Sequence, residues 1–180
     1  MPLILVVMGL CALAIRLDSP GPVLFQQPRT GRDGLRFRMY KFRTMVPNAA
    51  ELEDSLRHLS ILPPPAFKII DDPRITRVGR FLRKSSLDEL PQLINVMRGD
   101  MSLVGPRPTP WPVAQYELWQ TARLEVPPGI TGLWQVEGRN TTDFSGWLRL
   151  EMRYMQRLSL WQDLVILGRT AGAVIRGTGE

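Results

Sequence analysis

The sequence predicts an α+β fold, mostly helical with a small β-hairpin, in a single domain that begins with a re-entrant, helix-break-helix membrane segment. Three observations support this. An uncharged, mostly apolar run opens the chain, two segments of alternating polarity flank a glycine-rich turn, and later apolar residues recur every three or four positions. The 180 residues suffice for one domain with a core, and no repeat or linker suggests a second. The predicted boundaries are therefore 1–22 for the membrane-associated helix and 23–180 for the main domain.

The opening apolar run is too short to cross a membrane as a straight helix. It spans 14 residues, Pro2 to Ile15, whereas a spanning helix needs roughly 20. The sequence Ser19-Pro20-Gly21-Pro22 then breaks the helix, because proline lacks a backbone N–H donor. One interpretation is a soluble helix followed by a loop. The length of the run and the net charge of +6 favour a segment that enters the membrane and returns, with Ser19 and Pro20 at the break.

The remaining elements follow from local patterns. Alternating residues on both sides of the turn sequence RTGRDG predict a β-hairpin over 22–42. A short helix is expected over 48–60 with Asn48 as its N-cap, and two more helices over 144–158 and 161–175. The segment 126–140 is rich in glycine and proline. It is either a loop that must approach something closely or a set of turns.

Composition narrows the chemistry. With one cysteine, Cys11, and one histidine, His58, the chain has no internal disulfide, and zinc or histidine-dependent nucleophilic sites are disfavoured. Chemistry must then use carboxylates, lysine, arginine, hydroxyls or a hard metal ion. A predicted helix at 74–84 has an apolar face of Ile75, Val78 and Phe81/Leu82. It also carries five cations, which form either a solvated face or a contact for phosphates of lipid or nucleotide. With Phe81 its one aromatic residue, this stretch does not predict a nucleic-acid partner.

Asp88 and Glu89 allow two interpretations. Ser86 and Glu89 fit a capping box at the start of an apolar helical pattern, and acids there complement the helix dipole. Alternatively, the two acids are a catalytic pair. The local pattern alone leaves both open.

Three motifs, taken together, carry a resemblance to a known family. They are DSPGPVLFQQPRTGRDGLRFRMYKFRTM, DDPRITRVGRFLRKSSLDELPQLINVMRGDMSLVGPRP and PGITGLWQVEGR, in that order. In these motifs the chain resembles the bacterial sugar transferases. More narrowly, it is similar to the catalytic domain of monotopic phosphoglycosyl transferases that initiate exopolysaccharide or O-antigen synthesis. The resemblance covers nearly the whole chain.

The resemblance implies a reaction. Asp88 and Glu89 correspond to the catalytic dyad of the family, which requires Mg²⁺, so both are also the expected metal-binding residues. The aspartate attacks the sugar-bearing phosphorus of a UDP-sugar, releases UMP and holds the phosphosugar until a polyprenyl (undecaprenyl) phosphate accepts it. A carboxylate is a competent nucleophile for such a transfer. The implied location is the bacterial inner (cytoplasmic) membrane, with the catalytic domain on the cytoplasmic face and in contact with anionic membrane lipid.

The same motifs suggest substrate-binding residues. Guanidinium groups suit bidentate contacts with oxyanions, and surface ion pairs or hairpin charges are the alternative roles for these cations. The candidates for binding substrate phosphates are Arg107, Arg139, Lys41 and Arg43. Glu151 is a candidate substrate-binding acid, although the family more often has aspartate there. Its extra methylene displaces the carboxylate.

Two further departures and one competing function remain. The apolar start is shorter than in the family, which favours a truncated membrane element or a misassigned start, and the multi-span module of many relatives is absent.

The alternative function is a non-catalytic, basic membrane-surface interaction protein whose Asp-Glu pair only caps a helix. UMP release that depends on Asp88 separates the two. The sequence does not identify the sugar, although its motifs are most similar to those of the family members that transfer a hexose-1-phosphate. It also leaves open whether the chain forms a homo-oligomer.

Overall fold

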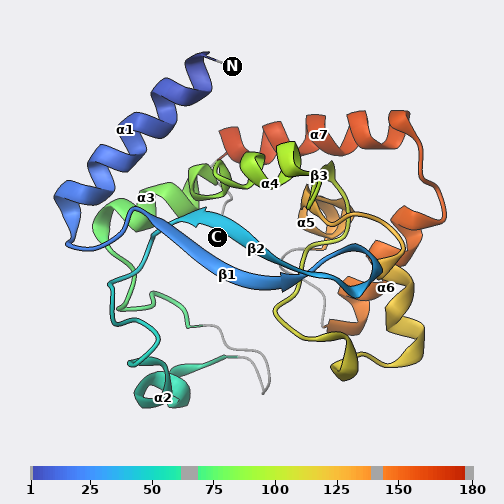
Figure 1. The fold of residues 1–180 in the computed structure, drawn as a ribbon, viewed down its shortest axis with the longest axis horizontal. Coiled ribbons are helices and arrows are strands. Elements are labelled where there is room, and N and C mark those ends of the chain that lie inside the picture. Colours follow the sequence, from blue (N-terminus) through green and yellow to red (C-terminus); the bar gives the residue numbers. More distant parts are fainter. Residues whose placement is uncertain (1, 62–68, 139–143, 177–180) are drawn as a thin grey trace.

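A long antiparallel β-hairpin crosses the centre of the molecule in the computed structural model, which describes residues 2–61, 69–138 and 144–176 (Figure 1). Its strands, β1 (Leu24–Thr30) and β2 (Arg36–Phe42), pair with Gln27 opposite Met39. The turn between them includes Asp33 and Gly34 at positive φ. The predicted hairpin is therefore confirmed, because alternation and turn residues are local signals.

Helix α1 (Pro2–Asp18) projects from one end of the hairpin (Figure 1). Its Cys11 and Ile15 pack with Phe42 of β2 and Leu82 of α3 (Arg77–Lys84) in the first of two cores. The helix ends just before Ser19, as predicted. The helix-break-helix prediction is wrong for the described residues, because β1 and not a second helix follows the break. No helix in the described part of the chain is long and apolar enough to cross a membrane.

Helix α3 is the predicted basic helix, and it differs from the sequence pattern in two ways. Leu82 is buried but Phe81 is exposed, so the apolar face is narrower than expected. Arg74, counted among the five cations, is buried and forms an ion pair with Asp72 at 2.7 Å. Thr76 caps the helix by accepting a hydrogen bond from the Gly79 amide. The exposed charges of this region are therefore fewer than the sequence suggests.

A second core forms around two short parallel strands that the sequence did not predict. Strand β3 (Ser102–Val104) pairs with β4 (Gly129–Thr131), and Val104 packs with residues of three helices. A Cβ at Gly129 would overlap the backbone of Gly105, so the first of the two interpretations of segment 126–140, a close approach, holds at Gly129, where two backbones meet. The surrounding helices are α5 (Leu133–Glu137), α6 (Phe144–Met155) and α7 (Leu160–Ile175).

The predicted C-terminal helices are confirmed with slightly different bounds, whereas the helix expected over 48–60 is reduced to a short turn of helix. Asn48 lies before it in a series of turns and is not its N-cap. The remaining helical elements are α2 (Glu53–Leu56), α4 (Gln92–Arg98), and the 3-10 turns η1 (Arg32–Gly34), η2 (Arg57–Leu59), η3 (Leu87–Glu89), η4 (Val113–Gln115) and η5 (Leu118–Leu124). Of these, η3 contacts β2 and α3, and its Leu87 packs against the first core.

Candidate active site

Asp88 and Glu89 lie in the 3-10 turn η3, and helix α4 begins only at Gln92. Ser86 has φ 56° and makes no side-chain capping bond, so the capping-box interpretation is wrong. An N-cap residue needs extended backbone angles, whereas Ser86 adopts the left-handed conformation that closes the end of α3. The two acids are thus held in a tight turn that leaves their side chains available for other contacts.

Glu89 is the meeting point of cations from distant parts of the chain. Its Oε1 accepts a hydrogen bond from Lys41 Nζ at 2.8 Å and another from an Arg107 terminal nitrogen at 3.3 Å. Lys41 reaches it from β2, where it shares a face with the buried Met39 two residues away. Arg107 comes from the loop after β3. The structure therefore brings together four of the predicted site residues, Asp88 included.

The environment of Asp88 is both desolvated and electropositive. Only 9% of the residue is exposed. Burial raises the pKa of the Asp88 carboxyl above its ordinary value, and the positive charge of Lys41 is the largest effect that opposes the rise. The neighbouring Glu89 raises this pKa further, whereas Arg83 and Arg107 lower it. A carboxylate that is more basic than usual and surrounded by cations suits nucleophilic attack on an anionic phosphorus centre.

Glu151 lies behind the Arg107 loop and not in the open site. Its carboxylate is buried, and its Oε1 accepts hydrogen bonds from the Arg107 backbone amide at 2.7 Å and from Trp147 Nε1 at 2.7 Å. Its Oε2 forms an ion pair with Arg123 at 2.9 Å. Burial raises the pKa of Glu151, while Arg123 opposes the rise. These contacts favour a role within the protein over the predicted contact with substrate.

Arg29 is a third cation of the site, beside Lys41 and Arg107, and the sequence reasoning missed it. With Lys41 and Arg107 it lines a cleft of about 190 Å³, together with Met39, Gln92, Pro108 and Gly129. Burial, with the neighbouring charges of Arg107 and Arg36, lowers the pKa of Arg29 to about 10. The only sign of this cation in the sequence was the arginine of QQPRTG, which precedes the hairpin turn. Its position on β1 looks like an ordinary surface charge until the hairpin is placed against the Arg107 loop.

One predicted residue, Arg43, lies away from this cluster. Arg43 is buried and donates to the carbonyl oxygens of Pro20 at 2.6 Å and Ser19 at 2.9 Å, so it fastens the end of α1 to the domain. These contacts give no support to phosphate binding by Arg43. They show instead how Ser19 and Pro20 are held. Arg139 lies outside the described residues.

The donor set can be compared with the needs of a magnesium ion. The described residues contain no group of three or more acidic, cysteine or histidine side chains suited to a metal. Asp88 and Glu89 offer carboxylate oxygens in one turn. Mg²⁺ usually binds through one or two carboxylates plus substrate phosphates and water, so a pair of acids in contact with cations of the cleft fits such an ion.

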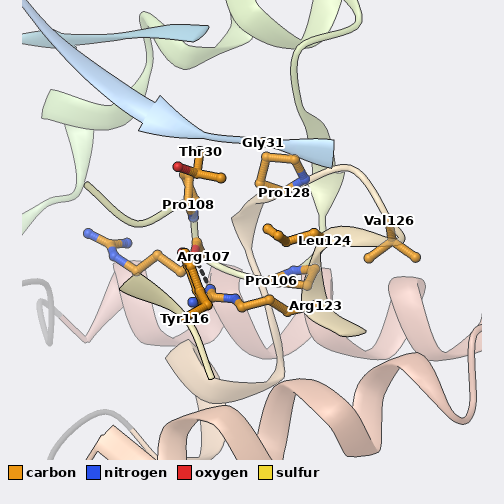
Figure 2. Close-up of a pocket in the computed structure, with 10 residues that line it drawn as sticks. All are labelled: Thr30, Gly31, Pro106, Arg107, Pro108, Tyr116, Arg123, Leu124, Val126 and Pro128. Atoms are coloured by element: carbon orange, nitrogen blue, oxygen red, sulfur yellow. Dashed lines mark hydrogen bonds between the residues drawn. The ribbon is translucent and has the colours of Figure 1, made fainter. Parts of the chain in front are cut away.

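A second cleft, of about 200 Å³, shares Arg107 and Pro108 with the first (Figure 2). Figure 2 shows Arg123 bonded to the Arg107 backbone, while the Arg107 side chain extends away from the other lining residues. Tyr116 and Pro106 also line this cleft. Arg107 thus lines both a cleft with three cations and a cleft whose lining is mostly proline and apolar side chains.

Comparison with known proteins identifies the family. The model of the bacterial sugar transferase family matches residues 1–177. The chain is 47% identical over 169 residues to the galactosyl transferase CpsE of Streptococcus agalactiae serotype III, covering 92% of this chain and 37% of that protein. It is 46% identical over 171 residues to the undecaprenyl-phosphate galactose phosphotransferase of Salmonella typhimurium, covering 88% and 34% respectively.

A shorter relative aligns along most of its own length. The exopolysaccharide production protein ExoY of Sinorhizobium fredii is 40% identical over 189 aligned positions, which cover 99% of this chain and 80% of that protein. The chain spans about a third of the first two relatives, with 37% and 34% of their lengths. The family predicted from the three sequence motifs is confirmed, and the chain belongs to the bacterial sugar transferase family.

Proposed function

We propose that this chain transfers a phosphosugar from a UDP-sugar to a polyprenyl phosphate such as undecaprenyl phosphate, releasing UMP. The observation that carries the proposal is the placement of the buried Asp88 beside Glu89, whose carboxylate receives both Lys41 and Arg107. Phosphoryl transfer is limited by the charge of the reacting groups, and cations placed before the reaction reduce that cost. The names of the relatives support the same class of donor and acceptor.

The first step is attack by an Asp88 carboxylate oxygen on the sugar-bearing phosphorus. A new P–O bond forms to Asp88 while the bond between that phosphorus and the bridging oxygen breaks, and UMP leaves with the electron pair. Arg107 and Arg29 border the cleft on which the diphosphate would lie, and Lys41 borders it from β2. Guanidinium and ammonium groups there stabilise the charge that moves onto the leaving UMP.

In the second step an oxygen of the polyprenyl phosphate attacks the same phosphorus. The bond to Asp88 breaks, the carboxylate is regenerated, and the product is a polyprenyl diphosphate sugar. The ion pairs of Glu89 with Lys41 and Arg107 hold its carboxylate next to Asp88. Both steps can therefore proceed with the same arrangement of the two acids. Mg²⁺, held by Asp88 and Glu89 with the substrate phosphates, would neutralise the diphosphate and polarise the bond that breaks.

The acceptor is a lipid, so the site must work at a membrane surface, and we place it on the cytoplasmic face of the inner membrane. Helix α1 carries the supporting feature. One side packs on the domain, and the other exposes leucines over its whole length: Leu3, Leu5, Leu10, Leu13 and Leu17. An exposed apolar helix face beside a basic chain suits burial in a leaflet that contains anionic lipid.

The test is release of UMP from a panel of UDP-hexoses and N-acetylated UDP-sugars by the purified chain, with undecaprenyl phosphate in mixed micelles. Wild-type protein should release UMP from at least one donor and form a lipid-linked phosphosugar. A radiolabelled phosphosugar should be trapped on the peptide that contains Asp88 when the acceptor is omitted. Absence of UMP with every donor contradicts the transferase, whereas turnover without a trapped adduct contradicts only the covalent intermediate. The non-catalytic alternative predicts vesicle binding and no UMP.

A further inference from the structure

Arg107 is held by its backbone as well as by its side chain. Glu151 Oε1 accepts a hydrogen bond from the Arg107 amide, and a terminal nitrogen of Arg123 donates to the Arg107 carbonyl oxygen (Figure 2). Glu151 and Arg123 are themselves joined by an ion pair at 2.9 Å. One acid and one base therefore hold the N–H and the C=O of a single residue, and we call this pair the Arg107 clamp.

The clamp is buried and tightly surrounded. Its side chains are only 3% exposed for Arg123 and 2% exposed for Glu151. The Arg123 guanidinium lies 5.3 Å from the ring centre of Trp147, whose Nε1 donates to Glu151. Trp147 in turn stacks on Trp134 at 4.7 Å between ring centres. A buried ion pair usually contributes little net stability, so the bonds of this pair to the Arg107 backbone point to a positioning role.

We propose that Glu151 and Arg123 are positioning residues, which fix the backbone of Arg107 so that its guanidinium reaches Glu89 and the substrate diphosphate. The proposal rests on the proposed function for the identity of the substrate. Because Glu151 is buried and its Oε1 accepts from the Arg107 amide, Arg123 and Trp147, it acts through Arg107 and does not itself bind the substrate. The distant helix α6 thereby sets the geometry of the catalytic turn.

The first test is a double-mutant cycle on kcat/KM for UMP release. Glu151→Gln can still accept the Arg107 amide but loses its charge toward Arg123. A displacement of about 1 Å in a substrate-binding group costs up to about 100-fold, so we expect a loss of roughly 10–100-fold. In an Arg107→Lys background the same change should cost less than about threefold, because the positioned group is already gone. An equal loss in both backgrounds overturns the proposal.

A second variant covers the case in which Glu151→Gln does not fold. Trp147→Phe removes one donor to Glu151 and keeps an aromatic ring against Trp134, so neither buried charge is left alone. It should show a smaller loss of kcat/KM that also disappears in the Arg107→Lys background. Glu137→Gln is the matched control, since Glu137 is a partly exposed glutamate that pairs with Arg153 of α6 and Arg169 of α7 and makes no contact with the clamp in these ion pairs. It should keep wild-type kinetics.

Amide hydrogen exchange separates the clamp from the proposed function. The Arg107 amide should exchange at least about tenfold faster in Glu151→Gln than in wild type or Glu137→Gln, because its acceptor is weakened. Unchanged exchange overturns the clamp whatever the activity. If wild-type protein releases no UMP, the proposed function fails while the exchange result still decides the clamp. If Arg107→Lys is as active as wild type, the functional part of the clamp is wrong.

Discussion

Lys41 Nζ lies 2.8 Å from Glu89 Oε1, and this ion pair joins the central hairpin to the turn that carries Asp88. Both side chains are largely buried, with 18% and 15% of their surfaces exposed. A hydrogen bond between charged groups in such surroundings resists displacement more than a surface ion pair does. The pair therefore fixes the position of turn η3 relative to the hairpin, and its role can be tested apart from Asp88.

Lys41→Met should lower both stability and activity. Loss of the ammonium leaves Glu89 partly desolvated with one donor fewer, and we expect the free energy of unfolding to fall by about 1–3 kcal/mol. Denaturant titration measures this change. Lys41→Met/Glu89→Gln should recover most of the stability but none of the UMP release. Lys84→Met removes an exposed lysine from α3 and should change neither quantity. Recovery of activity in the double variant would show that the pair is only structural.

Asp88→Asn should abolish UMP release and yet raise the thermal midpoint at pH 7. Because burial raises the pKa of Asp88, the folded state binds its proton more tightly than the unfolded state does. The ionised form then costs stability above the folded-state pKa, and asparagine removes this cost.

The pH dependence of the Asp88→Asn effect has a definite sign. The stability that protonated Asp88 contributes is present below its unfolded-state pKa and is lost as pH rises through the raised pKa. The gain from asparagine should thus shrink as pH falls through that range, as measured by thermal melts in EDTA. Asp54→Asn, at an exposed carboxylate, is the control. A midpoint for Asp88→Asn below that of wild type at pH 7 contradicts the desolvation argument.

Turnover should depend on magnesium through Glu89. Excess EDTA should stop UMP release and added Mg²⁺ should restore it, because two carboxylates beside a diphosphate match the hard oxygen ligands of this ion. Glu89→Gln should shift the Mg²⁺ titration of any residual activity to higher concentration by about tenfold, as expected when one carboxylate ligand is lost. Full activity in EDTA is the result that rejects the metal.

Arg29→Gln should raise KM for the UDP-sugar more than it lowers kcat. Arg29 lines the cationic cleft, and its lowered pKa reflects a charge that burial and two neighbouring arginines disfavour. An anion in the cleft relieves that repulsion, so the loss of Arg29 should weaken binding by about tenfold. Arg32→Gln, on the exposed turn of the same hairpin, should have no effect. Equal KM values for the two variants would exclude Arg29 from the donor site.

Membrane binding should depend on the exposed side of α1. Leu10→Glu/Leu13→Glu places charge on two exposed leucines without touching Cys11 or Ile15 in the core. Cosedimentation with vesicles that contain anionic lipid should fall by at least about tenfold, because charged groups are costly in the apolar part of a leaflet. Leu35→Glu, at an equally exposed site in the hairpin turn, should bind as wild type does. Undiminished binding of the α1 variant places the membrane contact elsewhere.

Local features of the sequence determined several parts of this protein. Alternation and turn residues predicted the hairpin, the 3.6-residue period predicted α6 and α7, and the three motifs predicted the family. Adjacent residues need no folding to be neighbours, so the Asp88–Glu89 pair was visible as well. The local pattern failed at Ser86. Serine with glutamate three residues later fits a capping box, but the same residues also occur where the backbone is left-handed, as it is here.

Only the tertiary structure decided which charges meet. Lys41 and Glu89 are 48 residues apart, and Arg107 and Glu151 are 44 apart, so their contacts depend on how the hairpin and α6 pack. The same packing sends Arg43 to the end of α1 and brings Arg29, overlooked in the sequence, into the cleft. The sequence does not show whether a charged side chain faces water, a carbonyl or a carboxylate. Its partner depends on how the elements pack, and that packing is driven by the burial of apolar residues such as Met39 and Val104.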